Sequence, residues 1–282
     1  MKNICILSNS IKDENLELGK KIRADIARLA EEAGIEGINT PLLDLCDDED
    51  IDTRGIEAII VIGGDGSVLS AAKRTIGSGV PLIGFNLGAV GFLAEVEPSD
   101  SEKALKRLLT DDIKIEERMM LRGSVYRGGK IVESGHALND VVIARRGDMM
   151  LSGYSISVNG SYLSDFRADG IIISTPTGST AYNLSAGGAI VKPDARLIQM
   201  TPVAAHLLNN RSVIFSGDDV VAVSILPSTG RHPVATGVSF DGNQHAALQE
   251  GDVVKVTSSG QVTRIIRLSD DGFLQILQKK MV

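Results

Sequence analysis

The sequence predicts an α/β N-terminal domain with a doubly wound, mainly parallel sheet, followed by a C-terminal domain rich in β-strands. The N-terminal part of the chain alternates short apolar runs with helical patterns, which is typical of parallel strands joined by crossover helices. After about Lys114 the chain changes to short strand-like segments separated by turn residues. A length of 282 residues suits two domains. We therefore expect domains over 1–114 and 115–262, and a tail over 263–282 whose return to the first domain the sequence leaves open.

The first domain is expected to open with a strand and an amphipathic helix. The strand covers Asn3–Ser8, and the helix runs over about Asp13–Ala33, where apolar residues recur at helical spacing until Gly34 ends it. A short strand is expected over Ile35–Thr40, and a later one over Val80–Phe85.

The stretch around which this domain is organised is a strand that runs directly into a glycine turn. Ile59–Ile62 are β-branched and apolar on both faces, which predicts a strand buried on both sides. The glycines Gly63, Gly64 and Gly66 follow, and they let the backbone turn sharply and approach a bound group. We expect Ser67 to cap a helix that starts there. A strand, a glycine turn and a helix N-terminus together predict a phosphate site.

Asp65 lies inside this predicted phosphate site, where its negative charge would repel the ligand. Two chemical roles would explain it: holding a metal ion, or accepting a proton from an attacking hydroxyl group. The structural alternative is a strand-to-helix turn that merely tolerates Asp. A second glycine-punctuated turn, Asn86–Leu93, follows the next strand. Because parallel strands end at one edge of a sheet, both turns are expected to face the same crevice.

The second domain carries polar groups that a plain β scaffold does not need. Asn139 and Asp140 lie at the mouth of a predicted strand, where together they can grip the hydroxyls of a ribose; the alternative is an Asx turn before the strand. A second polar loop, rich in hydroxyl groups and glycine, lies within Arg167–Gly188, with a helical interruption near Ser179–Ala189. The expected strands are Met120–Tyr126, Val141–Ala144, Ser155–Val158, Gly170–Ser174, Val220–Ile225, Gly237–Asp241 and Asp252–Ser258.

Composition excludes several classes of function. The formal net charge of −7 gives no electrostatic basis for binding nucleic acid, and the absence of tryptophan weakens any base-stacking surface. No apolar run is long enough to span a bilayer, and the N-terminal residues show no signal-peptide pattern. The two cysteines, Cys5 and Cys46, lie far apart, which favours a reducing compartment. We expect a cytoplasmic protein that binds neither membrane nor nucleic acid.

As an ordered set, these motifs resemble the NAD kinase family. The set comprises the Gly63–Ser67 turn, the Asn86–Leu93 turn, the Asn139-Asp140 pair, the Asp169–Gly188 block, Thr201–Arg211 and Asp241-Gly242-Asn243. The glycine-aspartate turn alone is shared with phosphofructokinases and diacylglycerol-type lipid kinases, whereas the block from Thr175 to Gly188 is far more specific. The resemblance implies NAD as the acceptor, ATP or another phosphoryl donor such as polyphosphate, and a divalent metal, Mg²⁺ above all. It also implies a homodimer or homotetramer in which neighbouring subunits contribute to the NAD site.

The resemblance also implies roles for individual residues. Asp65 matches the family's catalytic base, Asn139 and Asp140 match a ribose-holding pair, and Phe92 matches an apolar contact to adenine. Ser70 stands where many members carry Arg or His, so the groups that neutralise the phosphates are open, as are the metal ligands. The further substrate contacts implied by the match are Gly66, Arg167, Asp169, Thr180, Ala181, Tyr182, Asn183, Leu184, Ser185 and Asn243.

The sequence therefore predicts a cytoplasmic NAD kinase, which transfers a phosphoryl group from ATP or another donor to the 2′-hydroxyl of the adenosine ribose of NAD, giving NADP. No GxxxxGK[ST] motif is present, which excludes a P-loop enzyme. One alternative is a lipid or sugar kinase with the same glycine-aspartate turn, although the polar loop at Thr180–Ser185 does not suit a lipid. The other is a dinucleotide-binding regulator or dehydrogenase, although no GxGxxG with a later acidic residue follows a strand.

Overall fold

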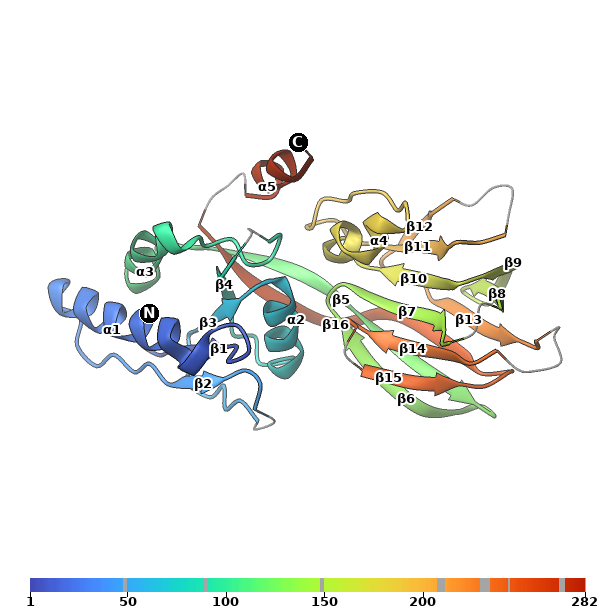
Figure 1. Cartoon of the computed structure of the whole chain (residues 1–282), viewed down its shortest axis with the longest axis horizontal. Coiled ribbons are helices and arrows are strands. Elements are labelled where there is room, and N and C mark those ends of the chain that lie inside the picture. The colour runs from blue at the N-terminus through green and yellow to red at the C-terminus, as the bar shows by residue number, and fades with distance from the viewer. Residues whose placement is uncertain are drawn as a thin grey trace. The chain divides into compact units, whose positions relative to one another are not determined.

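The computed structural model divides the chain into two compact units (Figure 1). Unit 1 comprises Met1–Arg118 and Val262–Val282, and unit 2 comprises Met119–Gln261. Two long strands, β5 (Lys114–Arg127) and β16 (Val253–Arg267), contribute residues to both. The structure describes residues 1–47, 50–88, 91–147, 150–206, 211–228, 234–242, 244–268 and 272–281.

Unit 1 contains the parallel sheet that the sequence predicts. Its strands lie in the order β2-β1-β3-β4-β16, and each neighbouring pair is parallel. The order is not the order of the chain, so helices must cross between strands. Because β1 and β3 run in register to Ser8 and Ile62, the turns that follow them start at the same edge of the sheet. The bounds are β1 Ile4–Ser8, β2 Leu42–Asp44, β3 Ala58–Gly63 and β4 Leu82–Asn86.

Helices cover both faces of this sheet. Apolar residues of α1 (Glu17–Glu32) and α3 (Ser101–Leu109) share one core with alternate residues of β1 and β3. The helix α2 (Asp65–Arg74) packs against β3 and β4, and the intervening strand residues are buried too. Burial on both faces explains why these strands are apolar throughout. The remaining elements of unit 1 are η1 Glu14–Leu16, η2 Pro98–Asp100 and α5 Gly272–Met281.

Two predictions about unit 1 are wrong. The strand expected over Ile35–Thr40 is absent from these described residues, where Asn39 forms only an isolated bridge with Asn3, and the strand beside β1 is β2 instead. Gly37 has a φ of +76°, which interrupts an extended strand. Ser67 does not cap α2, because the helix begins two residues earlier, at Asp65, with Gly64 at the N-cap position. The turn at Gly63 lets the helix start sooner than the serine suggested.

Unit 2 is an antiparallel β structure with one short helical insertion. One sheet has the order β12-β11-β10-β7-β14-β15, and β8 pairs with both β9 and β13, which pairs in turn with β16. The bounds are β6 Lys130–Ala137, β7 Asp140–Arg145, β8 Ser152–Val158, β9 Ser161–Ala168, β10 Gly170–Ser174, η3 Thr177–Thr180, α4 Tyr182–Ser185, β11 Leu197–Val203, β12 Val213–Ser216, β13 Val221–Leu226, β14 Thr236–Phe240 and β15 Gln244–Leu248.

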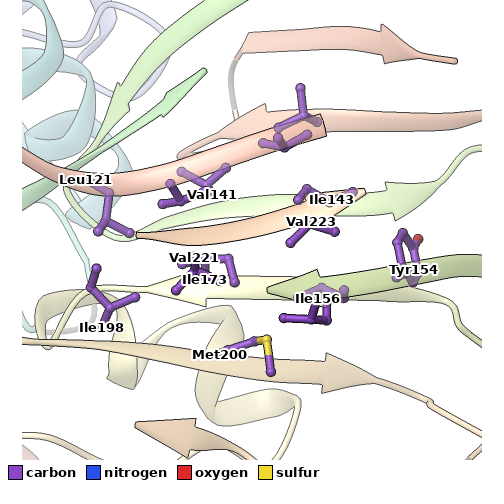
Figure 2. Close-up of a cluster of buried hydrophobic side chains, with 14 of the residues drawn as sticks. Leu121, Val141, Ile143, Tyr154, Ile156, Ile173, Ile198, Met200, Val221 and Val223 are labelled. Carbon is purple, nitrogen blue, oxygen red and sulfur yellow. The ribbon is translucent and has the colours of Figure 1, made fainter. Parts of the chain in front are cut away.

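The core of unit 2 lies between these two layers of strands. Figure 2 shows side chains from β7, β10 and β11, such as Val141, Ile173 and Met200, in the same cluster as Ile156 of β8 and Val223 of β13. Apolar residues alternate with polar ones along several strands, which leaves one face of each layer to solvent. Within the described residues, no helix has the length and apolar character needed to cross a membrane.

Candidate active site

Asp65 is the first residue of α2 and follows the glycine turn that ends β3. Its side chain is half-buried, and the next residue, Gly66, is exposed. The side chain therefore lies at the positive end of the helix dipole.

Both oxygens of Asp65 accept hydrogen bonds from the turn after β4. Oδ2 accepts from the backbone N–H of Phe92 at 2.9 Å, and Oδ1 accepts from those of Leu93 and Ala94 at 3.0 Å each. The approach depends on Gly91, because a Cβ there would lie 1.8 Å from Oδ1 of Asp65. The two glycine turns therefore contact each other directly, as expected for turns at one edge of the sheet.

The glycine turn itself is tightly built. A Cβ at Gly63 would lie 2.2 Å from Oγ of Ser67, so the buried hydroxyl occupies the space that only glycine leaves open. Oγ of Ser67 accepts a hydrogen bond from Nδ2 of Asn9 at 3.1 Å, in the turn after β1. The hydroxyl is thus used inside the turn, while Gly64 and Gly66 leave the backbone of the first helical turn accessible.

One basic side chain lies over this turn. Nζ of Lys12 lies 3.4 Å from the position that a Cβ at Gly64 would take. Lys12 is exposed, and none of the described carboxylates forms an ion pair with it. The sequence-based prediction missed this residue. The sequence does contain a signal for it. Lys12 shortly follows the first strand, and the turns after β1 and β3 start at the same edge of the sheet, so a lysine in the first turn can reach the second.

Phe92 lies beside Asp65 and presents its ring to the C-terminal helix. The ring centroid lies 6.0 Å from that of Phe273, and Nζ of Lys280 lies 4.9 Å from the same ring. Its backbone N–H is one of the Asp65 donors. Unit 1 therefore brings together the predicted phosphate turn, the predicted base and the predicted adenine contact.

In unit 2, Asn139 and Asp140 lie at the start of β7, as expected. The preceding turn is held by Asp241, whose carboxylate accepts from the backbone N–H groups of Leu138, Asn139 and Asp140 at 2.7–3.1 Å. Asp241 has a φ of +53°. The sequence-based prediction listed Asp241 only as part of a motif and did not recognise that it fixes this turn.

The polar ends of this pair are buried and incompletely paired. Within the described part of the chain, Oδ1 of Asn139 has no hydrogen-bond partner, which is unusual for a buried polar atom. Asp140 is only 6% exposed, and burial, with the nearby charge of Asp241, raises the pKa of its carboxyl group to about 7. An unpaired amide oxygen and a carboxyl group with a raised pKa on adjacent residues are typical of a binding site.

The polar loop after β10 packs on this same turn. Thr175 donates its backbone N–H to the carbonyl of Asn139 at 2.8 Å and its hydroxyl to the carbonyl of Leu138 at 2.5 Å. A Cβ at Gly178 would lie 2.2 Å from the carbonyl oxygen of Asn139. The loop that carries the predicted adenosine contacts is therefore fixed beside the predicted ribose pair.

Within that loop, the predicted contacts differ in exposure. Tyr182 is 46% exposed and Leu184 40% exposed, and Ser185 is exposed as well. Thr180 and Ala181 are half-buried. Asn183 is fully buried, and its Oδ1 accepts a hydrogen bond from Oγ1 of Thr201 at 2.6 Å, so this side chain anchors the loop from inside.

Asp169 directly precedes the opposite end of the same strand pair, and Arg167 lies two residues earlier, in β9. The register pairs Asp140 with Ser174 at one end of β7 and β10, and Ala144 with Gly170 at the other. Four residue steps along a strand correspond to about 13 Å. There, Asp169 accepts from Nε of Arg145 at 2.6 Å, and this hydrogen bond lowers the pKa of Asp169. Asn243 lies outside the described residues.

A metal site made by the protein alone is not evident. Across the described part of the chain, no group of three or more His, Cys, Asp or Glu side chains could hold a metal ion. The carboxylate of Asp65 is the acidic group nearest the predicted phosphate turn, and three backbone donors already contact it.

Comparisons with known proteins identify the family of this chain. Residues 45–113 match the model of the ATP-NAD kinase N-terminal domain, and residues 138–268 match that of the ATP-NAD kinase C-terminal domain. The chain is 38% identical over 288 residues to an NAD kinase of Lachnoclostridium phytofermentans, covering 99% of each chain. It is 41% identical over 234 residues to an NAD kinase of Lachnospira eligens, covering 80% of each.

Solved structures show the same fold. A yeast NADH kinase complexed with NADH has a TM-score of 0.83 at 21% identity, with 100% of this chain and 87% of that chain covered. An NAD kinase from Archaeoglobus fulgidus in complex with ATP has a TM-score of 0.76 at 20% identity, with 98% of each chain covered. With near-complete coverage by relatives well above 30% identity, the chain belongs to the NAD kinase family and is a kinase.

Proposed function

We propose that this protein phosphorylates NAD at the 2′-hydroxyl of its adenosine ribose, with ATP as the donor, to give NADP. Its relatives are named NAD kinase, and two proteins of the same fold bind NADH and ATP respectively. The observation that carries the proposal is the place of Asp65: a carboxylate at the first residue of a helix, in a glycine turn, beside an aromatic ring.

Asp65 acts as the general base in this proposal. A carboxylate offers about four lone-pair positions, and the three backbone donors leave one on Oδ2 for a substrate hydroxyl. The same donors fix the carboxylate, so little reorganisation is needed during the reaction. Phosphoryl transfer depends mainly on positioning and charge neutralisation, and a base contributes about 10²–10⁴ in rate.

The donor phosphates bind at the start of α2. The backbone N–H groups around Gly64 and Gly66 face them, together with the positive end of the helix dipole. Lys12 supplies a positive charge over Gly64, whereas Ser70 has no charge to offer. A magnesium ion bound to the donor phosphates would supply further neutralisation of the charge on the transferred group.

The NAD acceptor is held by the groups of unit 2. Asn139 and Asp140 exchange hydrogen bonds with the ribose hydroxyls, and the exposed side chains of the α4 loop contact the rest of the dinucleotide. Asp169 precedes Gly170, which lies about 13 Å along β10 from the residue paired with Asp140, and Arg167 lies two residues before Asp169. We propose that Arg167 and Asp169 serve the site of a neighbouring subunit in a dimer or tetramer.

The direct test is to incubate the protein with NAD, ATP and Mg²⁺ and to measure NADP with an NADP-specific dehydrogenase. An NAD analogue with 2′-deoxyadenosine should give no product, which assigns the acceptor hydroxyl. Replacing ATP with polyphosphate compares the two donors, and chelating the metal should stop the reaction. Absence of NADP under all these conditions would refute the proposed function.

A further inference from the structure

A network of buried charges lies behind the Asp65 turn. Arg267, near the end of β16, contacts Oε2 of Glu95 through Nη1 at 2.5 Å and Oε2 of Glu116 through Nε at 3.0 Å. Glu116 also pairs with Arg118 at 2.7 Å. The side chains of Arg267, Glu95 and Arg118 are 8%, 10% and 2% exposed. Two arginines and two glutamates balance, so the network carries no net charge.

Two arginines surround the carboxylate of Glu116 in this network. Burial opposes the charge of Glu116, but the positive charges and hydrogen bonds of Arg118 and Arg267 outweigh it and hold the pKa of Glu116 below its ordinary value. Glu95 makes a further contact with this strand end, because its Oε1 accepts a hydrogen bond from the backbone N–H of Leu268 at 3.1 Å. The segment around Glu95 is thus attached to the end of β16 at two points.

The network reaches Asp65 through the backbone of one residue, Phe92. Nη2 of Arg267 donates to the carbonyl oxygen of Phe92 at 3.2 Å, and the N–H of Phe92 donates to Oδ2 of Asp65 at 2.9 Å. Phe92 is therefore held from both sides, by the guanidinium at its carbonyl and by the carboxylate at its amide. Arg267 contacts the same turn a second time through its ion pair with Glu95. Glu95 follows Ala94, whose backbone N–H also donates to Asp65.

We propose that Arg267 is a positioning residue for Asp65. It fixes the Phe92–Glu95 backbone, and that backbone fixes the carboxylate at the start of α2. Arginine suits the task because its planar guanidinium reaches Glu95, Glu116 and the Phe92 carbonyl at once, whereas a lysine ammonium has no such fork. The inference rests on the proposed function in naming Asp65 as the base.

The test is a double-mutant cycle. Arg267→Met should lower kcat for NADP formation by about tenfold or more, because a small displacement of a catalytic group has a large effect on rate. The KM for NAD should stay within about threefold, since the lost contact orients the base. In the Asp65→Asn background, the same substitution should change the residual rate by less than about threefold, because the two residues act through one group.

Arg264→Met is the matched control. It lies on the same strand, and its ion pair with Glu117 is exposed on both sides. Its kcat should equal that of the wild type in either background. Equal losses for Arg267→Met in both backgrounds, or an unchanged kcat in the folded variant, would overturn the proposal. If Arg267→Met does not fold, Arg267→Lys and Glu95→Gln can replace it in the double-mutant cycle. Each should lower kcat by less than the roughly tenfold expected for Arg267→Met.

Hydrogen exchange separates this inference from the proposed function. In Arg267→Met the amides of Phe92, Leu93 and Ala94 should exchange at least about tenfold faster than in the wild type, whereas Arg264→Met should leave them unchanged. This readout needs no substrate. Faster exchange in a protein that makes no NADP would refute the proposed function and keep the positioning contact, and unchanged exchange in an active protein would refute only the contact.

Discussion

At the scale of single residues, Asp65 joins a proposed chemical role to a structural one. Asp65→Asn removes the base and leaves only one oxygen for three backbone donors, so an amide N–H₂ must face a peptide N–H. Turnover should fall by about 10²-fold or more. NAD affinity measured by calorimetry without a donor should change little, because the lost interaction belongs to the transition state.

The structure adds a second expectation for the same variant. Because the substitution breaks hydrogen bonds to a charged group, thermal unfolding should also shift to lower temperature. Asp100→Asn, at the N-cap position of α3 and without a side-chain capping bond, is the control and should leave both turnover and melting unchanged. Restoration of the rate by Mn²⁺ would assign Asp65 to the metal instead, and near-wild-type turnover would exclude the base role.

The raised pKa of Asp140 predicts how the stability of the protein depends on pH. Its pKa is about 7 in the folded protein because of burial and the charge of Asp241, against an ordinary value of 3.8. Between these values the unfolded chain is ionised while the folded protein holds the proton, so this group's contribution to stability is full below pH 4 and is lost as the pH rises through 7. Asp140→Asn should therefore unfold at a higher temperature than the wild type at pH 8, with the difference shrinking toward pH 4. The stabilisation is at most about 4 kcal/mol.

Binding should show the opposite trend. If the ionised carboxylate accepts a ribose hydroxyl, the KM for NAD falls as the pH rises through 7, and Asp140→Asn loses both this dependence and about 1.5–3 kcal/mol of binding energy. The exposed Asp218→Asn serves as the control in both measurements. A KM for NAD that is unchanged in the Asp140 variant would rule out the ribose role.

Lys12 is the remaining prediction at this scale. Lys12→Met removes the positive charge over Gly64, so the KM for ATP should rise by about tenfold while the KM for NAD stays nearly constant. Lys20→Met, on the exposed surface of α1, is the control for the loss of one charge. Equal ATP kinetics in the two variants would remove Lys12 from the site.

At the scale of elements, the contact between two glycine turns sets the geometry. Gly91→Ala places a Cβ 1.8 Å from Oδ1 of Asp65, so the turn after β4 must move away from α2. We expect a loss of about 1–3 kcal/mol in the free energy of unfolding, together with a fall in kcat. Gly88→Ala, in the same turn, meets no atom within 4 Å and should behave as the wild type in both assays. Full activity in Gly91→Ala would show that the contact is dispensable.

At the scale of the whole molecule, the opposite ends of β7 and β10 predict a shared site. Asp140→Ala and Arg167→Ala should each lose most activity as pure proteins. If each site takes the first residue from one subunit and the second from its neighbour, mixing unfolded chains in equal amounts and refolding them should restore about a quarter of wild-type activity for a dimer.

The expected quarter of wild-type activity follows from how the chains combine. Half of the dimers are then mixed, and in each of these one site is intact while the other carries both substitutions. Light scattering should show a dimer or tetramer, which would cover the exposed Tyr162 and Leu163 of β9. Absence of restoration, or a fully active monomer, would refute the shared site.

The sequence by itself determined the features that depend on neighbouring residues. The β-branched run before Gly63 predicted a strand buried on both faces, the turn residues after Lys114 predicted a β-rich part, and the ordered motifs predicted the family, which the comparisons confirm. The expected strand over Ile35–Thr40 and the capping role of Ser67 were wrong, because glycine conformation decided where those elements begin.

Only the tertiary structure decided which distant groups meet. The backbone N–H groups that donate to Asp65 lie 27 to 29 residues further along the chain, and the Arg267 donor lies 175 residues beyond Phe92. The raised pKa of Asp140 and the separation of Arg167 from the ribose pair likewise depend on burial and strand register. Periodicity along a chain reports the face on which a side chain lies, whereas hydrogen bonds and ion pairs between segments depend on how strands align and helices pack.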